Sequence, residues 1–252
     1  MYFESHAHYD DEAFNEDRDE LLLSLKDSGI GYVIQSAANI SSSKAGIELA
    51  KKYDFIYCAI GVHPHDTEEL DEEKFKELKS LAAEEKVVAI GEIGLDYYYD
   101  NAPRDLQKYW FERQMELSKE VNLPVIIHSR EASQDTFDLI EKVKPVGGVI
   151  HCYSGSVEMA KEYVKKGFYI GVGGTVTFKN AKKVVEVVKE IPLSSILIET
   201  DAPYLSPVPL RGKRNDSRNL KYVVEKIAEI KDITSEDVAR ITMENGKKLF
   251  KI

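Results

Sequence analysis

All six histidines of the chain occupy positions from which they could bind a metal ion together. Each lies at, or just beyond, the carboxyl end of a short apolar run that is typical of a β-strand, and two carboxylates lie at equivalent positions. Imidazole and carboxylate ligands without thiolate suit a divalent cation such as Zn²⁺, Mn²⁺ or Mg²⁺. Metal-dependent chemistry is therefore the first hypothesis. The residues are His6, His8, His63, His65, Glu92, His128, His151 and Asp201.

Glu92 is the most informative of these residues. It lies within the otherwise apolar run of residues 87–95, and an unpaired buried carboxylate costs several kcal/mol even after relaxation. A cation or a strong hydrogen-bond donor is therefore expected against it. We also expect the flanking Gly91 and Gly94 to leave room for that bulky neighbour, which would favour a metal over packing.

Each of these residues has a simpler explanation when it is taken alone. A single His-X-His pair, or His128 or His151, is more often structural than a metal ligand. Asp201, which precedes Ala-Pro, could cap a turn. Packing does not easily explain why five separate strand ends all carry ligand-type residues, so the metal hypothesis is preferred.

The elements that would position these residues alternate between strand and helix. Strict alternation predicts a parallel sheet, and eight units in 252 residues predict one (β/α)₈ TIM barrel, a single domain over residues 1–252. In such a barrel the carboxyl ends of the strands converge on one mouth. An open doubly wound sheet is the alternative, and the lack of a Gly-rich phosphate fingerprint after the first strand speaks against it.

The predicted strands cover residues 1–5, 31–37, 55–63, 87–95, 124–129, 146–152, 168–174 and 195–201. The predicted helices cover residues 16–29, 41–54, 105–122, 133–143, 156–167 and 180–191, and residues 220–250 as two helices broken near Asp232. Gly29 is expected to end the first helix and Thr234 to cap the last.

Composition excludes several classes of protein. A net charge of −10 argues against a broad surface for long nucleic acid, which is usually basic. No run of about eighteen apolar residues and no secretory signal is present, so a cytoplasmic protein without membrane contact is expected, and we take it to be a monomer. Cys58 and Cys152 are expected to be reduced packing residues.

Six short motifs carry a family resemblance. In chain order they read HAHYD, GVHPH, GEIGLDYY, PVIIHSREA, HCYSG and ETDAPYLSPVPLRGKRN. Together they resemble the signatures of the TatD-type metal-dependent deoxyribonucleases, which belong to the amidohydrolase-like TIM barrels. The similarity runs from residue 6 to the C-terminal ENGKKLF, with Glu4 standing where the family usually has Asp.

The resemblance implies a centre of two divalent ions that share Glu92. His6, His8 and Asp201 would complete one site with Glu92, and His128 and His151 would complete the other. His63 would lie on the substrate side rather than act as a ligand. Catalytic roles are expected for Asp201 as general base, Glu92 and His63, with the ions lowering the pKa of a bound water.

Substrate contacts are expected mainly from the basic and aromatic residues that follow the strands. They are His63, His65, Arg130, Tyr153, Arg211, Arg214 and Asn215. Tyr97, Tyr98, Tyr99 and Tyr153 could also stack on an unpaired base, although core or rim packing is the more common role of each tyrosine taken alone. Glu199 has the same strand parity as Asp201 and is expected one layer deeper, where it would orient a ligand histidine.

The leading hypothesis is a two-metal deoxyribonuclease that hydrolyses phosphodiester bonds from single-stranded or frayed DNA ends. The first alternative is an amidohydrolase-type deacylase or esterase, because the same metal-activated hydroxide can attack a carbonyl. The second alternative is a non-catalytic protein that binds metal or nucleic acid. Such a protein would have no need of the complete set of ligands.

Overall fold

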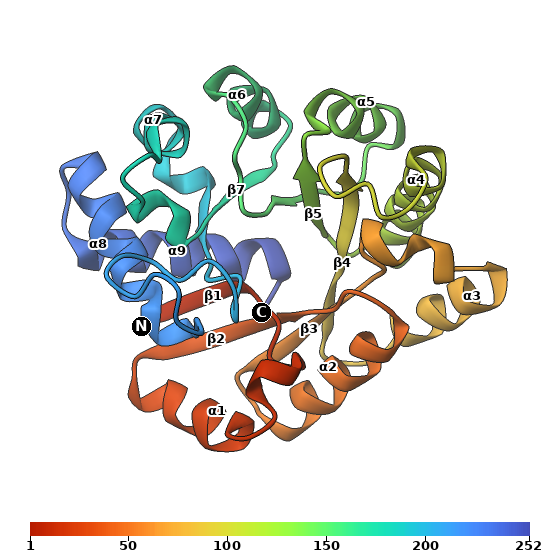
Figure 1. Ribbon diagram of the computed structural model, residues 1–252, viewed down its shortest axis with the longest axis horizontal. Helices are drawn as coiled ribbons and strands as arrows, with labels where there is room; N and C mark the ends of the chain where they lie inside the picture. Colours follow the sequence, from red (N-terminus) through yellow and green to blue (C-terminus); the bar gives the residue numbers. More distant parts are fainter. The chain divides into compact units, whose positions relative to one another are not determined.

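The computed structural model describes residues 1–252, in which strands and helices alternate along the chain (Figure 1). The eight strands follow one another across one sheet in the order β1 to β8, and the recorded pairs are parallel. This strand order is that of a (β/α)₈ barrel. The strands are β1 (Tyr2–Ala7), β2 (Ile30–Ser36), β3 (Ile56–Ile60), β4 (Val87–Asp96), β5 (Val125–Arg130), β6 (Gly148–Ile150), β7 (Tyr169–Val172) and β8 (Ile196–Ile198).

Nine α-helices and five short 3₁₀-helices connect the strands. The α-helices are α1 (Arg18–Asp27), α2 (Ile40–Lys52), α3 (Glu72–Leu81), α4 (Arg104–Val121), α5 (Ser133–Val143), α6 (Val157–Lys165), α7 (Lys182–Glu190), α8 (Leu220–Lys231) and α9 (Ser235–Phe250). The 3₁₀-helices are η1 (Glu12–Phe14), η2 (Pro64–Glu69), η3 (Gly174–Thr177), η4 (Leu193–Ser195) and η5 (Ser217–Asn219).

Local sequence signals account for several helix ends. Gly29 adopts a φ of +83° directly after α1, and Asp232 adopts a φ of 54° at the break between α8 and α9. The Thr234 hydroxyl accepts a hydrogen bond from the backbone N–H of Asp237 and caps α9. The expected stop, break and cap are thus confirmed. Helix α3 was not among the predicted helices; Asp71 caps it by accepting from the N–H groups of Glu73 and Lys74.

The chain forms two compact units. Unit 1 comprises Met1–Ile34 with Cys152–Ile252, and unit 2 comprises Gln35–His151. No helix of the structure is both long enough and apolar enough to cross a lipid bilayer.

In unit 1, helix α9 packs against strand β1 and beside α8 (Figure 1). The Phe3 ring of β1 stacks on Phe250 with ring centroids 5.8 Å apart and on Tyr32 at 5.6 Å. Gly246 of α9 lies against the same Phe3 ring, where an added Cβ would come within 2.6 Å of a ring carbon. The absence of a side chain at Gly246 therefore sets how closely α9 approaches β1.

In unit 2, helices α2, α4 and α5 pack against strands β3, β4 and β5 respectively. All ten residues of β4 are buried, Glu92 among them. Two buried glutamines of α4 supply hydrogen bonds to the ends of these strands. The Gln107 side chain accepts from the N–H of Asp96 and donates to its carbonyl, and Gln114 pairs in the same way with Val62. Helix α4 thus fixes the backbone on which the histidines and carboxylates of this unit are mounted.

We predict that Gly246→Ala destabilises the protein although alanine favours helices. The helix propensity gain is about 1 kcal/mol, whereas overpacking against Phe3 costs about 1–3 kcal/mol. Urea denaturation should therefore show a lower free energy of unfolding. Gly31→Ala is the control, because its Cβ would meet only the flexible side chains of Met243 at 3.3 Å and Met1 at 3.6 Å. A Gly246→Ala protein more stable than wild type would contradict this packing.

Candidate metal centre

Three residues of unit 1 form the first group of candidate ligands. The Nε2 atoms of His6 and His8 lie 3.0 Å apart, and they lie 3.6 Å and 3.4 Å from Oδ1 of Asp201. The His6 side chain is fully buried, whereas Asp201 keeps 16% of its side-chain surface exposed. All three atoms therefore face one another at the end of β1, beside a route to solvent.

The chemistry of these donors fits a divalent cation. Nitrogen or oxygen ligands bound at about 2.0–2.1 Å to one tetrahedral ion lie roughly 3.3 Å from one another. The three measured separations bracket that value. Two imidazole nitrogens facing one carboxylate oxygen present convergent lone pairs, which a cation stabilises.

Backbone contacts within unit 1 hold this group in place. The N–H of Asp201 donates to the carbonyl of His6, and the N–H of His8 donates to the carbonyl of Ala202. Asp201 adopts a left-handed φ of 58°, a conformation that aspartate tolerates better than most residues. Beneath His6, the buried Glu4 carboxylate accepts hydrogen bonds from the backbone and hydroxyl of Thr200. Burial raises the pKa of Glu4 to about 8 although these hydrogen bonds favour its ionised form.

The second group lies in unit 2 around Glu92. Its Oε1 atom is 2.7 Å from Nε2 of His151 and 2.9 Å from Nδ1 of His128, and these two nitrogens are 3.3 Å apart. Glu92 is 4% exposed. These separations are shorter than those in unit 1 and are hydrogen-bond distances, so both rings point at the carboxylate that the sequence singled out.

His63 also faces Glu92, with its Nε2 atom 3.5 Å from Oε1. The Nδ1 atom of His63 accepts a hydrogen bond from the backbone N–H of His65, at 3.2 Å. Burial lowers the pKa of His63 to about 4, against the opposing charge of Glu92, so the ring is neutral at pH 7. A neutral ring that accepts at Nδ1 carries its proton at Nε2, so it is a hydrogen-bond donor rather than a ligand at that atom.

Asp96 completes the histidine cluster of unit 2. Its Oδ2 atom lies 3.1 Å from Nε2 of His128 and 3.0 Å from Nε2 of His65. Burial alone would raise the pKa of Asp96, but hydrogen bonds from His128 and the Tyr99 backbone outweigh it and hold the pKa far below its ordinary range. A carboxylate that accepts from one imidazole nitrogen orients the other nitrogen toward a metal. Asp96 therefore directs Nδ1 of His128 at Glu92.

Asp96 also affects the protonation of its partner. Burial alone would lower the pKa of His128, but the hydrogen bonds to Asp96 and Glu92 raise it above its ordinary value. Asp96 was not among the site residues predicted from the sequence. Its position was nevertheless informative, because Asp96 ends β4 and shares strand parity with Glu92.

The structure corrects the expected reason for the glycines beside Glu92. An added Cβ at Gly91 would come within 2.6 Å of the Ile126 side chain and 2.8 Å of its carbonyl oxygen. At Gly94, which has a φ of +146°, it would collide with the carbonyl of His128. Strand β5 occupies the space on both sides, so the prediction that this space serves a metal was wrong.

Comparison with known proteins agrees with this geometry. The family model described as TatD related DNase matches residues 3–251. The chain is 48% identical to the protein named "Uncharacterized metal-dependent hydrolase YabD" of Bacillus subtilis (strain 168), and the alignment covers 100% of both chains. It is 36% identical to "Uncharacterized metal-dependent hydrolase YcfH" of Escherichia coli (strain K12), over 99% of this chain and 95% of that protein.

This chain belongs to the TatD family of metal-dependent hydrolases. The crystal structure of the TatD homologue YjjV from Escherichia coli K12 matches with a TM-score of 0.94 and 30% identity, over 100% of this chain and 98% of that one. A TatD family protein from Entamoeba histolytica matches with a TM-score of 0.90 and 26% identity, over 99% of this chain and 98% of that one. The predicted (β/α)₈ fold and the predicted family are both confirmed.

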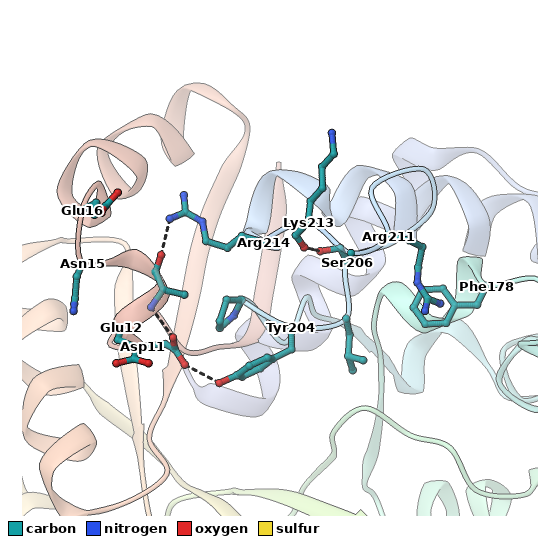
Figure 2. A pocket seen from close by; sticks show the side chains of 14 residues that line it. Asp11, Glu12, Asn15, Glu16, Phe178, Tyr204, Ser206, Arg211, Lys213 and Arg214 are labelled. Atoms are coloured by element: carbon teal, nitrogen blue, oxygen red, sulfur yellow. Dashed lines mark hydrogen bonds between the residues drawn. The ribbon is translucent and has the colours of Figure 1, made fainter.

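The basic residues that follow β8 in this TatD family member differ in their contacts. Arg214 donates to both carboxylate oxygens of Asp17, at 2.7 Å and 2.6 Å, and is thereby engaged by the protein. Arg211 has no carboxylate partner and lies over the Phe178 ring, 3.7 Å from its centroid (Figure 2). Only Arg211 of the two thus presents free N–H groups to a substrate.

Arg211 and Lys213 line an open pocket of about 1060 Å³ in unit 1. Figure 2 shows these basic side chains on one side of the pocket and Asp11, Glu12 and Glu16 on the other. Tyr204 lies between the two sides, and its hydroxyl donates to Asp11 at 2.7 Å. The Tyr204 ring is 6.4 Å from the His8 ring, so the pocket adjoins the first group of ligands.

Other predicted substrate contacts have polar atoms that the protein itself uses. Asn215 is fully buried and donates to the carbonyls of Thr200 and Tyr204, which fixes the loop after β8. Tyr153 is 6% exposed and donates its hydroxyl proton to the carbonyl of Ser156. These contacts give both residues a role in holding loops and lend no support to substrate binding.

Glu199 was predicted to orient a ligand histidine and Arg130 to contact the substrate. Glu199 accepts a hydrogen bond from the backbone N–H of Cys152, the residue that follows His151 in the chain. Arg130 ends β5, two residues after His128 and opposite Asp96 of β4. No comparison tests the assignments of individual site residues, and they stay predictions.

We predict that the two groups of ligands bind metal separately. In a Mn²⁺ titration followed by calorimetry, His8→Ala and His151→Ala should each weaken one of two binding events by more than about 100-fold. The family resemblance implies that both ions share Glu92, so Glu92→Ala should weaken both binding events. Glu190→Ala is the control, because Glu190 is an exposed carboxylate of α7 that pairs only with Lys161. A single binding event in the wild-type protein would contradict the assignment.

We predict that Asp96→Asn weakens metal binding without unfolding the protein. Asparagine keeps the size and one acceptor oxygen but removes the charge that orients His128, a change that typically costs about 10–100-fold in metal affinity. Calorimetry with Mn²⁺ measures this loss, and thermal denaturation checks the fold. Asp100→Asn is the control, since Asp100 is exposed and pairs with Arg104. Equal Mn²⁺ affinity in the two variants would show that Asp96 does not support metal binding.

Proposed function

We propose that this protein is a deoxyribonuclease that uses two divalent cations to hydrolyse phosphodiester bonds at single-stranded or frayed DNA ends. The family match and the hydrolase names of its relatives support the reaction class. The observation that carries the choice of substrate is the open pocket beside His8, in which Arg211 and Lys213 lie available to phosphate. A pocket of about 1060 Å³ is far larger than one phosphate ester needs, and it suits a strand that continues beyond the cleaved bond.

The charge distribution supports recognition of a strand end. The chain carries a net charge of −10, and the pocket has acidic residues opposite its basic ones. A protein with few basic contacts binds DNA locally, because affinity for long duplexes comes from neutralising many phosphates. Engagement of a short unpaired end needs only a few such contacts.

Asp201 and His63 have different roles in the proposed reaction. When bound, divalent cations supply Lewis acid stabilisation of the phosphoryl oxygens and an activated water. Asp201 is partly exposed and accepts the proton of the attacking water as the new P–O bond forms and the bond to the leaving oxygen breaks. His63, which carries its proton at Nε2, donates a hydrogen bond to a phosphate oxygen and holds the phosphorus in line.

An assay with end-labelled DNA tests the proposal. The protein should release nucleotides stepwise from one end of a single strand in the presence of Mn²⁺ or Mg²⁺, and EDTA should abolish the release. Asp201→Asn should lower kcat by about 10²–10⁴-fold, the usual contribution of a general base. His63→Ala should retain metal binding in calorimetry while it loses activity.

Parallel assays separate this function from the alternatives. Acyl and amide substrates serve as the comparison under the same metal conditions, and Tyr109→Ala on α4 serves as the control variant. Hydrolysis of acyl bonds alone would establish a deacylase or esterase instead. Binding of metal and DNA without any hydrolysis would establish a non-catalytic protein.

A further inference from the structure

Two tyrosines and one arginine form an exposed cluster at the carboxyl ends of β4 and β5. Tyr98 and Tyr99 are 55% and 54% exposed, and their rings meet edge to face with centroids 5.0 Å apart. The guanidinium carbon of Arg130 lies 4.0 Å from the Tyr98 centroid and 4.7 Å from the Tyr99 centroid. We refer to Tyr98, Tyr99 and Arg130 as the Tyr–Arg platform.

Arg130 differs from most arginines of the chain because its side chain pairs with no carboxylate. The Arg130 guanidinium contacts the Tyr98 and Tyr99 rings, so its N–H groups remain available to an acceptor. A guanidinium binds phosphate with parallel hydrogen bonds when no carboxylate competes for it. The arginines that do pair with carboxylates are Arg104, Arg113, Arg214, Arg218 and Arg240.

Hydrogen bonds to Asp96 hold the backbone of the platform and connect it to His65 and His128. The Oδ1 atom of Asp96 accepts the backbone N–H groups of Tyr98 and Tyr99, at 3.0 Å and 2.9 Å. The other oxygen of Asp96 contacts His128. The Tyr99 ring also lies edge-on against His65, with centroids 5.3 Å apart. The same carboxylate therefore positions a candidate metal ligand and the backbone of the platform.

A contiguous exposed patch of aromatic rings beside a polar group often marks a ligand-binding site. We propose that the Tyr–Arg platform binds one nucleotide of a single-stranded substrate next to the cleaved phosphate, and this rests on the proposed function. One of the two perpendicular rings stacks on the unpaired base while the other contacts the edge of that base, and Arg130 binds a backbone phosphate. Every base offers a flat face, so this recognition is tolerant of sequence but requires an unpaired base.

Binding to base-containing and abasic strands tests the platform. Fluorescence anisotropy measures the Kd of a phosphorothioate-linked oligothymidylate, which resists cleavage, and of an abasic strand with the same linkages. Tyr98→Ala combined with Tyr99→Ala should raise the Kd of the first strand by about 5- to 150-fold and leave the second unchanged. Arg130→Ala should raise both Kd values alike. Tyr109→Ala, which removes a 46% exposed tyrosine from α4, should change neither.

The outcomes separate the platform from the proposed function. If the tyrosine variant binds both strands as the wild type does, or loses affinity equally for both, the platform is overturned while cleavage by the wild type still supports a nuclease. If the wild type cleaves no strand but the tyrosine variant loses affinity only for the base-containing strand, the nuclease proposal fails and the platform stands. Thermal denaturation of each variant excludes unfolding as the cause of a lost affinity.

Discussion

Desolvated carboxylates enclosed by imidazole rings are the interaction on which this site depends. A buried carboxylate is stable only when donors or cations surround it, and a buried imidazole equally needs an acceptor. The buried Glu92 meets this requirement with His128 and His151, and the partly exposed Asp201 faces His6 and His8. Because each carboxylate and its histidines come from different elements, satisfying the charge also fixes where the strand ends must lie.

Asp96 is likewise surrounded by hydrogen-bond donors, and these donors include the backbone of the following loop. One of its oxygens accepts from histidines, while the other accepts from the main chain that carries two tyrosines. On the opposite side, Gln107 of α4 pairs with both backbone groups of Asp96. The end of β4 is thus held by hydrogen bonds from a helix, a histidine cluster and its own following loop. A binding site needs this kind of rigidity to keep its ligands ordered before a substrate arrives.

The sequence predicted the parts of the site that depend on local pattern. Histidines at strand ends follow from residue periodicity, and the alternation of strand and helix brings those ends to one edge of the sheet. The sequence could not show which polar residues of the loops are buried. Asn215 and Tyr153 carry groups that suit a substrate, yet loop paths turn them toward backbone carbonyls. Likewise, the partner of an arginine is set by tertiary packing, which gives Arg214 a carboxylate and Arg130 two rings.

The close approach of β5 to Gly91 and Gly94 has a consequence for how related sequences are interpreted. Gly91 and Gly94 lie where the main chains of β4 and β5 touch, and this contact does not depend on what occupies the space around Glu92. A descendant that had lost its histidines would still need both glycines to build the same sheet. The glycine spacing in this motif is therefore a marker of inheritance of the fold. Only the charged and imidazole residues report whether the chemistry has been kept.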